Sequence, residues 1–183
     1  MATVTVTVGG NTVNLTGKEL KVGDKAPVVE VCGKDLSSVK VGGKCDKIQI
    51  IATVPSLDTG VCATETRKFN KNAAGKTNVC LTVISMDLPF AMGRFCSTEG
   101  IENLTVASDF RNKDFGNAYG VLMKDGKLAG LLARAIFVVD KDGTIIHKEI
   151  VSEVTTEPDY EAIQATVKAH GGCGGSSCGC SSK

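Results

Sequence analysis

The sequence has almost no net charge and no segment suited to nucleic acid or a membrane. Its 183 residues carry 21 Lys and Arg against 20 Asp and Glu, and no basic run is interleaved with aromatic residues. No apolar stretch approaches the roughly 20 residues of a transmembrane helix. We therefore expect neither nucleic acid nor a membrane as a partner.

The first residues are expected to form a strand and not a secretion signal. Residues 1–8 alternate polar and β-branched side chains, which is typical of a strand. A cytoplasmic, reducing location is the expectation, and there the eight cysteines are reactive, metal-binding or core residues rather than structural disulfides. Neither His147 nor His170 has neighbours that suggest a metal ligand or a general base, and no cofactor is expected.

No two cysteines are spaced as Cys-x-x-Cys. The segment after the first predicted core strand holds one cysteine, Cys62, which argues against a thioredoxin-like dithiol exchanger. Cys32 and Cys45 have no partner at metal-ligand spacing. We expect Cys32 and Cys80 to be core residues and Cys45 to be a surface thiol.

What the sequence does contain is the pattern of a strand, a helix and a second strand. Residues 47–54 and 79–85 are apolar, β-branched runs typical of buried strands, and residues 61–74 show the helical period. This spacing predicts a right-handed βαβ unit with a parallel central sheet.

The turn between that strand and helix places a cysteine where it can react. Pro55 ends the strand, and Asp58 or Thr59 can cap the helix. With Thr59 as N-cap, Cys62 is the third helical residue, near unpaired N–H groups and the positive end of the helix dipole. A thiol there ionises more readily, and the thiolate is the nucleophile. The alternative is a small side chain that fills the helix face.

The remaining patterns predict a mixed α/β sheet with helices on both faces. The predicted elements are a hairpin over 3–8 and 11–15, strands at 28–31, 104–108, 131–140 and 144–150, a helix that includes Pro89, and a last helix from about 155 to 170. Residues 1–170 are thus expected to form one domain, followed by a tail over 171–183.

Two motifs resemble the peroxiredoxin family. Pro55-x-x-x-Thr59-x-x-Cys62 after a strand resembles its active-site loop, and Leu-Pro-Phe-Ala-x-x-Arg-Phe-Cys, ending at Cys96, resembles its thiol peroxidase branch, the atypical two-cysteine peroxiredoxins. The likeness extends from near the N-terminus to about Ala169. It implies a thioredoxin-like fold with an N-terminal hairpin, and a homodimer.

The resemblance also implies roles for single residues. Cys62 would attack hydrogen peroxide or an alkyl or lipid hydroperoxide, Cys96 would resolve it as an intrachain disulfide, and thioredoxin would reduce that disulfide. Thr59 would hydrogen-bond the sulfur and peroxide, and Arg134 would lie beside the sulfur. Without the resemblance, Cys96 is a core cysteine or a redox partner, Thr59 is a helix cap, and Arg134 is an edge residue with its head in water.

The tail departs from the resemblance. It is rich in Gly and Ser and carries Cys173, Cys178 and Cys180, a composition that predicts a flexible segment. Three thiols in eight residues can bind a soft metal such as zinc or copper(I), exchange disulfides with the active site, or do neither. With no fourth ligand nearby, no metal site is assigned, and metal binding or thiol exchange through the tail is the alternative function.

Overall fold

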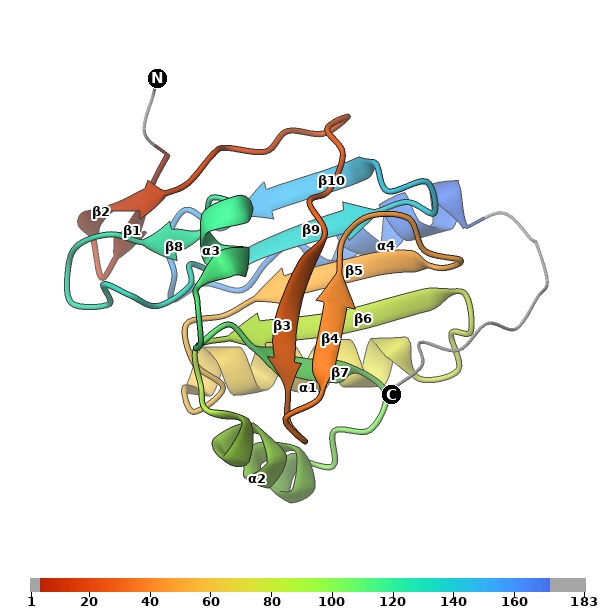
Figure 1. Ribbon diagram of the computed structural model, residues 1–183, viewed down its shortest axis with the longest axis horizontal. Coiled ribbons are helices and arrows are strands. Elements are labelled where there is room, and N and C mark those ends of the chain that lie inside the picture. Colours follow the sequence, from red (N-terminus) through yellow and green to blue (C-terminus); the bar gives the residue numbers. More distant parts are fainter. Residues whose placement is uncertain (1–3, 172–183) are drawn as a thin grey trace.

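The computed structural model describes residues 4–171. Its centre is a seven-stranded mixed sheet in the order β10-β9-β5-β6-β7-β3-β4 (Figure 1). The strands are β3 (Val29–Gly33), β4 (Ser38–Val41), β5 (Ile48–Thr53), β6 (Val79–Ser85), β7 (Thr105–Ser108), β9 (Ala135–Val139) and β10 (Ile145–Ile150). β5, β6 and β7 are parallel, and the other neighbours pair antiparallel.

The predicted N-terminal hairpin is part of a second, smaller sheet. Strands β1 (Thr5–Val8) and β2 (Asn11–Thr16) pair antiparallel, and β2 also pairs with β8 (Leu122–Met123). The turn between β1 and β2 needs positive φ at both central residues, which Gly9 (56°) and Gly10 (81°) adopt without strain.

Helices lie on both faces of the large sheet, as predicted. They are α1 (Gly60–Ala73), α2 (Pro89–Glu99), α3 (Asp114–Ala118) and α4 (Tyr160–His170). One apolar core holds Phe69 of α1, Met92 of α2 and Ile163 of α4, while the core on the opposite face holds Phe115 of α3. Figure 1 shows α3 in front of the sheet, with α1 and α4 behind it.

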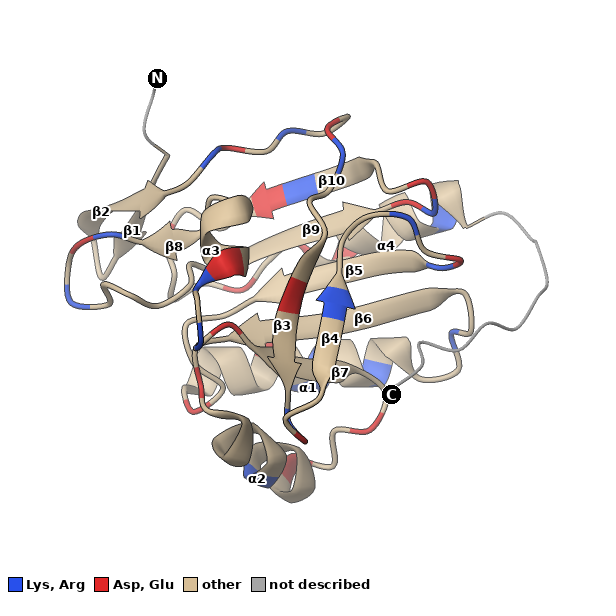
Figure 2. Cartoon of the chain, viewed as in Figure 1, with Lys and Arg blue, Asp and Glu red and all other residues tan. Residues whose placement is uncertain are grey.

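The predicted βαβ unit forms the middle of the molecule. β5 and β6 are parallel and joined by α1, and every residue of β5 is buried. Figure 2 shows no charged residue along β5, β6 or β9; within the large sheet, the coloured strands are β10, β3 and β4. Because parallel strands end at the same edge of a sheet, the segments that follow β5 and β6 are brought together there.

Several details differ from the sequence predictions: β8 was not predicted, and the strand predicted over 131–140 is the shorter β9, Ala135–Val139. Strand β4 was not predicted either. The last helix begins at Tyr160 because Asp159 is its N-cap, accepting a hydrogen bond from the Ala162 N–H (3.0 Å). Cys80 is only partly buried, since β7 begins at Thr105, opposite Thr82, and does not extend beside Cys80. The predictions of a buried Cys32 and of a helix including Pro89 are confirmed.

Candidate active site

The loop between β5 and α1 positions the candidate nucleophile. Pro55 is buried directly after the strand, and Thr59 is the N-cap of α1, as predicted. Cys62 is therefore the third helical residue. The first N–H bonded within the helix is that of Ala63, to the Thr59 carbonyl (2.9 Å), so the N–H groups of residues 60–62 have no helical acceptor. The positive end of α1 lies beside the sulfur.

Thr59 is the N-cap by its backbone conformation, but its side chain does not make the hydrogen bond to the first turn that is usual for an N-cap. Its hydroxyl donates to the Ser56 carbonyl (3.1 Å) and does not accept a hydrogen bond from the first turn of α1. The hydroxyl thus closes the loop before the helix. The expected contact of Thr59 with sulfur and peroxide stays a prediction.

Arg134 lies beside the Cys62 sulfur. One guanidinium nitrogen, Nη2, donates to Sγ at 3.2 Å, and Nε donates to the Val154 carbonyl at 3.0 Å. Cys62 and Arg134 are each only 1% exposed. A cation in this position stabilises negative charge that develops at the reacting atoms. The interpretation of Arg134 as an edge residue with its head in water is wrong, because the chain before β9 turns the side chain inward.

Glu65 balances the charge of this arginine, and it was missed in the sequence. Its Oε2 forms an ion pair with Arg134 Nη1, while its Oε1 has no hydrogen-bond partner among the described residues. Burial raises the pKa of Glu65 to about 7, with the guanidinium acting in the opposite direction. Burial also disfavours the charged form of Arg134, but Glu65 and Cys62 more than offset this and raise its pKa. Glu65 was recognisable only as a residue three positions after Cys62, on the same helix face.

Replacing Glu65 with Gln should remove one pH-dependent part of the free energy of unfolding. Because the folded-state pKa of about 7 exceeds the ordinary 4.5, the contribution of Glu65 is fully present below about pH 4.5 and is lost as the pH rises through about 7. The stability of the wild type relative to Glu65→Gln should therefore fall between about pH 5 and pH 8. Urea denaturation at several pH values measures this difference.

An exposed glutamate of α4 supplies the control for that measurement. Glu161→Gln changes the same functional group at the surface. Its stability difference from the wild type should change less over the same pH range than that of Glu65→Gln. A Glu65→Gln difference that is flat with pH would show that burial does not raise the pKa of Glu65.

Cys96 lies in the same apolar core as Cys62. It is on α2, 5% exposed, and both cysteines are free thiols in the structure. Burial raises the pKa of the Cys96 thiol, and Lys34 opposes this shift. Since a thiolate is the attacking species in thiol exchange, this direction of the shift disfavours attack by Cys96 while α2 is packed.

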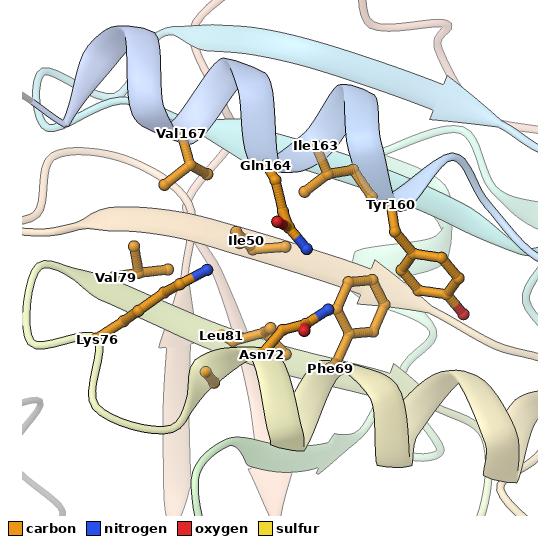
Figure 3. A pocket seen from close by; sticks show the side chains of 11 residues that line it. Ile50, Phe69, Asn72, Lys76, Val79, Leu81, Tyr160, Ile163, Gln164 and Val167 are labelled. Atoms are coloured by element: carbon orange, nitrogen blue, oxygen red, sulfur yellow. The ribbon is translucent and has the colours of Figure 1, made fainter.

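The seam between α1 and α4 borders this site. Figure 3 shows Tyr160 above Phe69, and their rings meet edge to face with centroids 5.4 Å apart. Lys68 lies over the Tyr160 ring (5.1 Å) and pairs with Glu157 (2.6 Å). The remaining space is about 20 Å³, room for roughly one water molecule, so the seam is a packing contact and not a ligand pocket.

The structure brings together Pro55, Thr59, Cys62 and Arg134 around one loop, with Cys96 in the adjoining core.

The described residues contain neither a metal site nor a membrane span. Within residues 4–171, no group of three His, Cys, Asp or Glu side chains is arranged to hold a metal ion. No helix in that range is long and apolar enough to cross a membrane. Cys173, Cys178 and Cys180 lie outside the described residues, so metal binding or thiol exchange by the tail stays a prediction.

Comparison with known proteins gives consistent matches over most of the chain. The family model for redoxins matches residues 21–163. A thiol peroxidase of Campylobacter jejuni is 55% identical over 171 residues, which are 93% of this chain and 95% of that protein. A crystal structure of a peroxiredoxin-like protein from Aquifex aeolicus superposes with a TM-score of 0.88 at 53% identity, covering 90% of this chain and 96% of that one.

A more distant structure shares the fold. The thiol peroxidase of Chromobacterium violaceum superposes with a TM-score of 0.81 at 21% identity, over 90% of this chain and 95% of that one. The thioredoxin-like sheet, with a cysteine at the start of the helix after its central strand, defines a thiol-based redox protein, and the chain belongs to the redoxin family. Relatives at 45–55% identity are thiol peroxidases, and the protein is a thiol-dependent peroxidase.

Proposed function

We propose that Cys62 is the peroxidatic nucleophile, that Cys96 resolves it within the same chain, and that thioredoxin reduces the product. The observation that carries this proposal is the 3.2 Å contact between Arg134 Nη2 and Cys62 Sγ at the start of α1. It places the sulfur and a fixed cation together at one buried point, which is the arrangement that nucleophilic attack on a peroxide needs.

In the first step, the Cys62 thiolate attacks the terminal oxygen of the hydroperoxide. The O–O bond breaks, the departing oxygen takes a proton and leaves as water or an alcohol, and Cys62 becomes a sulfenic acid. Arg134 stabilises the negative charge as it moves from sulfur to oxygen. We expect the unpaired N–H groups of residues 60–62 and the Thr59 hydroxyl, once released from the Ser56 carbonyl, to hydrogen-bond the peroxide, with buried Pro55 at the start of the loop that carries them.

In the second step, the Cys96 sulfur attacks the Cys62 sulfur, and the sulfenic oxygen leaves as water. Disulfide formation requires α-carbons within roughly 7 Å, so we expect α1 or α2 to unwind locally between the two steps. Unwinding would also expose the Cys96 thiol, which burial holds protonated. A thioredoxin dithiol then reduces the disulfide by exchange.

The proposal includes the setting of the reaction. The substrates are hydrogen peroxide and alkyl or lipid hydroperoxides, and the protein acts as a homodimer in the cytoplasm. Leu88, the N-cap of α2, and Phe90, in its first turn, are 53% and 72% exposed and supply apolar surface for a second copy to cover.

Adding one equivalent of cumene hydroperoxide to the fully reduced protein should yield a Cys62–Cys96 disulfide as the first stable product. Peptide mapping after rapid quenching identifies the linked cysteines. Cys96→Ser should accumulate the sulfenic acid of Cys62 instead, whereas Cys80→Ser, in a neighbouring strand, should give the same disulfide as the wild type.

Other disulfides would revise the proposal. A bond from Cys62 to Cys173, Cys178 or Cys180 would make the tail the resolving element and remove that role from Cys96. Oxidation scattered over all cysteines, with no preference for Cys62, would contradict the assignment of the nucleophile.

A further inference from the structure

We propose that Asp87 is a positioning residue that ties the loop before α1 to the segment that begins α2. By holding both segments in their folded positions, it favours attack of Cys62 on peroxide over formation of the disulfide. The second half of this statement rests on the proposed role of Cys96; the first half does not.

Three hydrogen bonds end on the Asp87 carboxylate. Two come from the loop before α1: the Ser56 hydroxyl donates to Oδ1 (2.7 Å), and the Leu57 N–H donates to Oδ2 (2.7 Å). The third comes from the Ser85 hydroxyl at the end of β6 (2.7 Å). One side chain therefore links the ends of two neighbouring parallel strands, β5 and β6.

The backbone of Asp87 is itself held by the sheet. Its N–H donates to the Ser85 hydroxyl (3.2 Å), and its carbonyl accepts from the Ser108 hydroxyl at the end of β7 (2.5 Å). Leu88, the next residue, is the N-cap of α2, and Pro89 is its first residue. Because Asp87 directly precedes this N-cap, a movement of the first turn of α2 also displaces Asp87.

These bonds bear on both cysteines. Cys62 follows Leu57 by five residues and Cys96 follows Asp87 by nine, and both sulfurs are buried in the packed state. Ser56 and Leu57 lie just before α1, so an unwinding of α1 that displaces this loop would break their bonds to Asp87, and unwinding of the start of α2 would move the carboxylate that accepts them. Either route to the disulfide loses the same bonds, so the carboxylate stabilises the folded arrangement against both.

Replacing Asp87 with Asn should change the two chemical steps in opposite directions. The amide keeps the shape but presents an NH₂ group, itself a donor, to one or more of the three donors. The rate constant for Cys62 oxidation by cumene hydroperoxide should fall about tenfold, because the loop is less well ordered. The rate constant for disulfide formation should rise several-fold, because the opened state is more populated.

A second carboxylate provides the matched control. Asp109 is buried and accepts two backbone hydrogen bonds, from the N–H groups of Phe115 (3.0 Å) and Gly116 (2.8 Å), but these fix α3 and not the loop. Asp109→Asn should lower the melting temperature without opposite changes in the two rate constants. Ser56→Ala, which removes one bond to Asp87, should change them in the same directions as Asp87→Asn but less.

Rapid-quench kinetics and hydrogen exchange of the reduced protein together decide the proposal. Exchange at amides 56–62 should be faster in Asp87→Asn than in wild type or Asp109→Asn. If Asp87→Asn lowers both rate constants, or matches Asp109→Asn in both kinetics and exchange, Asp87 has only a general structural role and the proposal fails.

Two of these measurements, the rate of Cys62 sulfenic acid formation and the exchange at amides 56–62, can be repeated in a Cys96→Ser background. They test whether Asp87 holds the loop independently of whether Cys96 resolves Cys62. If the wild type forms no Cys62–Cys96 disulfide, the resolving role of Cys96 fails. The rate of Cys62 sulfenic acid formation and the exchange at amides 56–62 then still show whether Asp87 holds the loop. Unchanged values for both in Asp87→Asn would refute that part as well.

Discussion

Cys62→Ser should abolish the reduction of hydroperoxides, with a fall in rate of about a thousandfold or more. Serine keeps the size of the side chain, but its hydroxyl is a far weaker nucleophile and cannot form a sulfenic acid. The variant should also form no Cys62–Cys96 disulfide. Stopped-flow kinetics with cumene hydroperoxide, at a fixed concentration of a dithiol reductant, measures the loss.

Cys32→Ser is the control for this change. Cys32 is equally buried, at the end of β3, and its replacement tests the effect of a hydroxyl in the core without touching the active-site loop. It should leave the peroxidase rate within about twofold of the wild type. Retention of activity in Cys62→Ser, or an equal loss in Cys32→Ser, would show that the nucleophile lies elsewhere.

The local geometry of the nucleophile could be predicted because its causes are local. Pro55 ends a strand, and Thr59 begins a helix through its own backbone conformation, with φ −124° and ψ 147°. These two positions place Cys62 at the third helical residue without reference to the rest of the chain. The parallel pairing of β5 and β6 across α1 followed in the same way from the lengths and apolar character of the segments.

Contacts between distant segments could not be predicted from such patterns. Glu65 and Arg134 are 69 positions apart, and Ser56 and Asp87 are 31 apart. Nothing in the local sequence of Glu65 distinguishes an ion-paired core residue from a solvated one on a helix surface. Its partner enters from the segment before β9, which only the folded sheet brings beside α1. The same reason explains why Arg134, without the family resemblance, is interpreted as an edge residue.

Arg134→Met should reduce both the stability and the peroxidase rate. Methionine fills similar volume but leaves the Glu65 carboxylate buried without its partner, which costs about 3–5 kcal/mol in the free energy of unfolding. The loss should be smaller at low pH, because a protonated Glu65 carries no charge that needs the partner. The rate should fall by about a hundredfold or more, since the cationic donor to the Cys62 sulfur is gone.

The double variant Glu65→Gln/Arg134→Met separates these two effects. Glutamine removes the stranded charge, so most of the lost stability should return, while the rate should stay low because no cation faces the sulfur. The exposed ion pair of Lys68 and Glu157 is the control. A double-mutant cycle on this pair should give a coupling energy under about 1 kcal/mol in the free energy of unfolding. If the rate returns together with the stability, Arg134 is only the counterion of Glu65, and its 3.2 Å contact with Cys62 has no catalytic role.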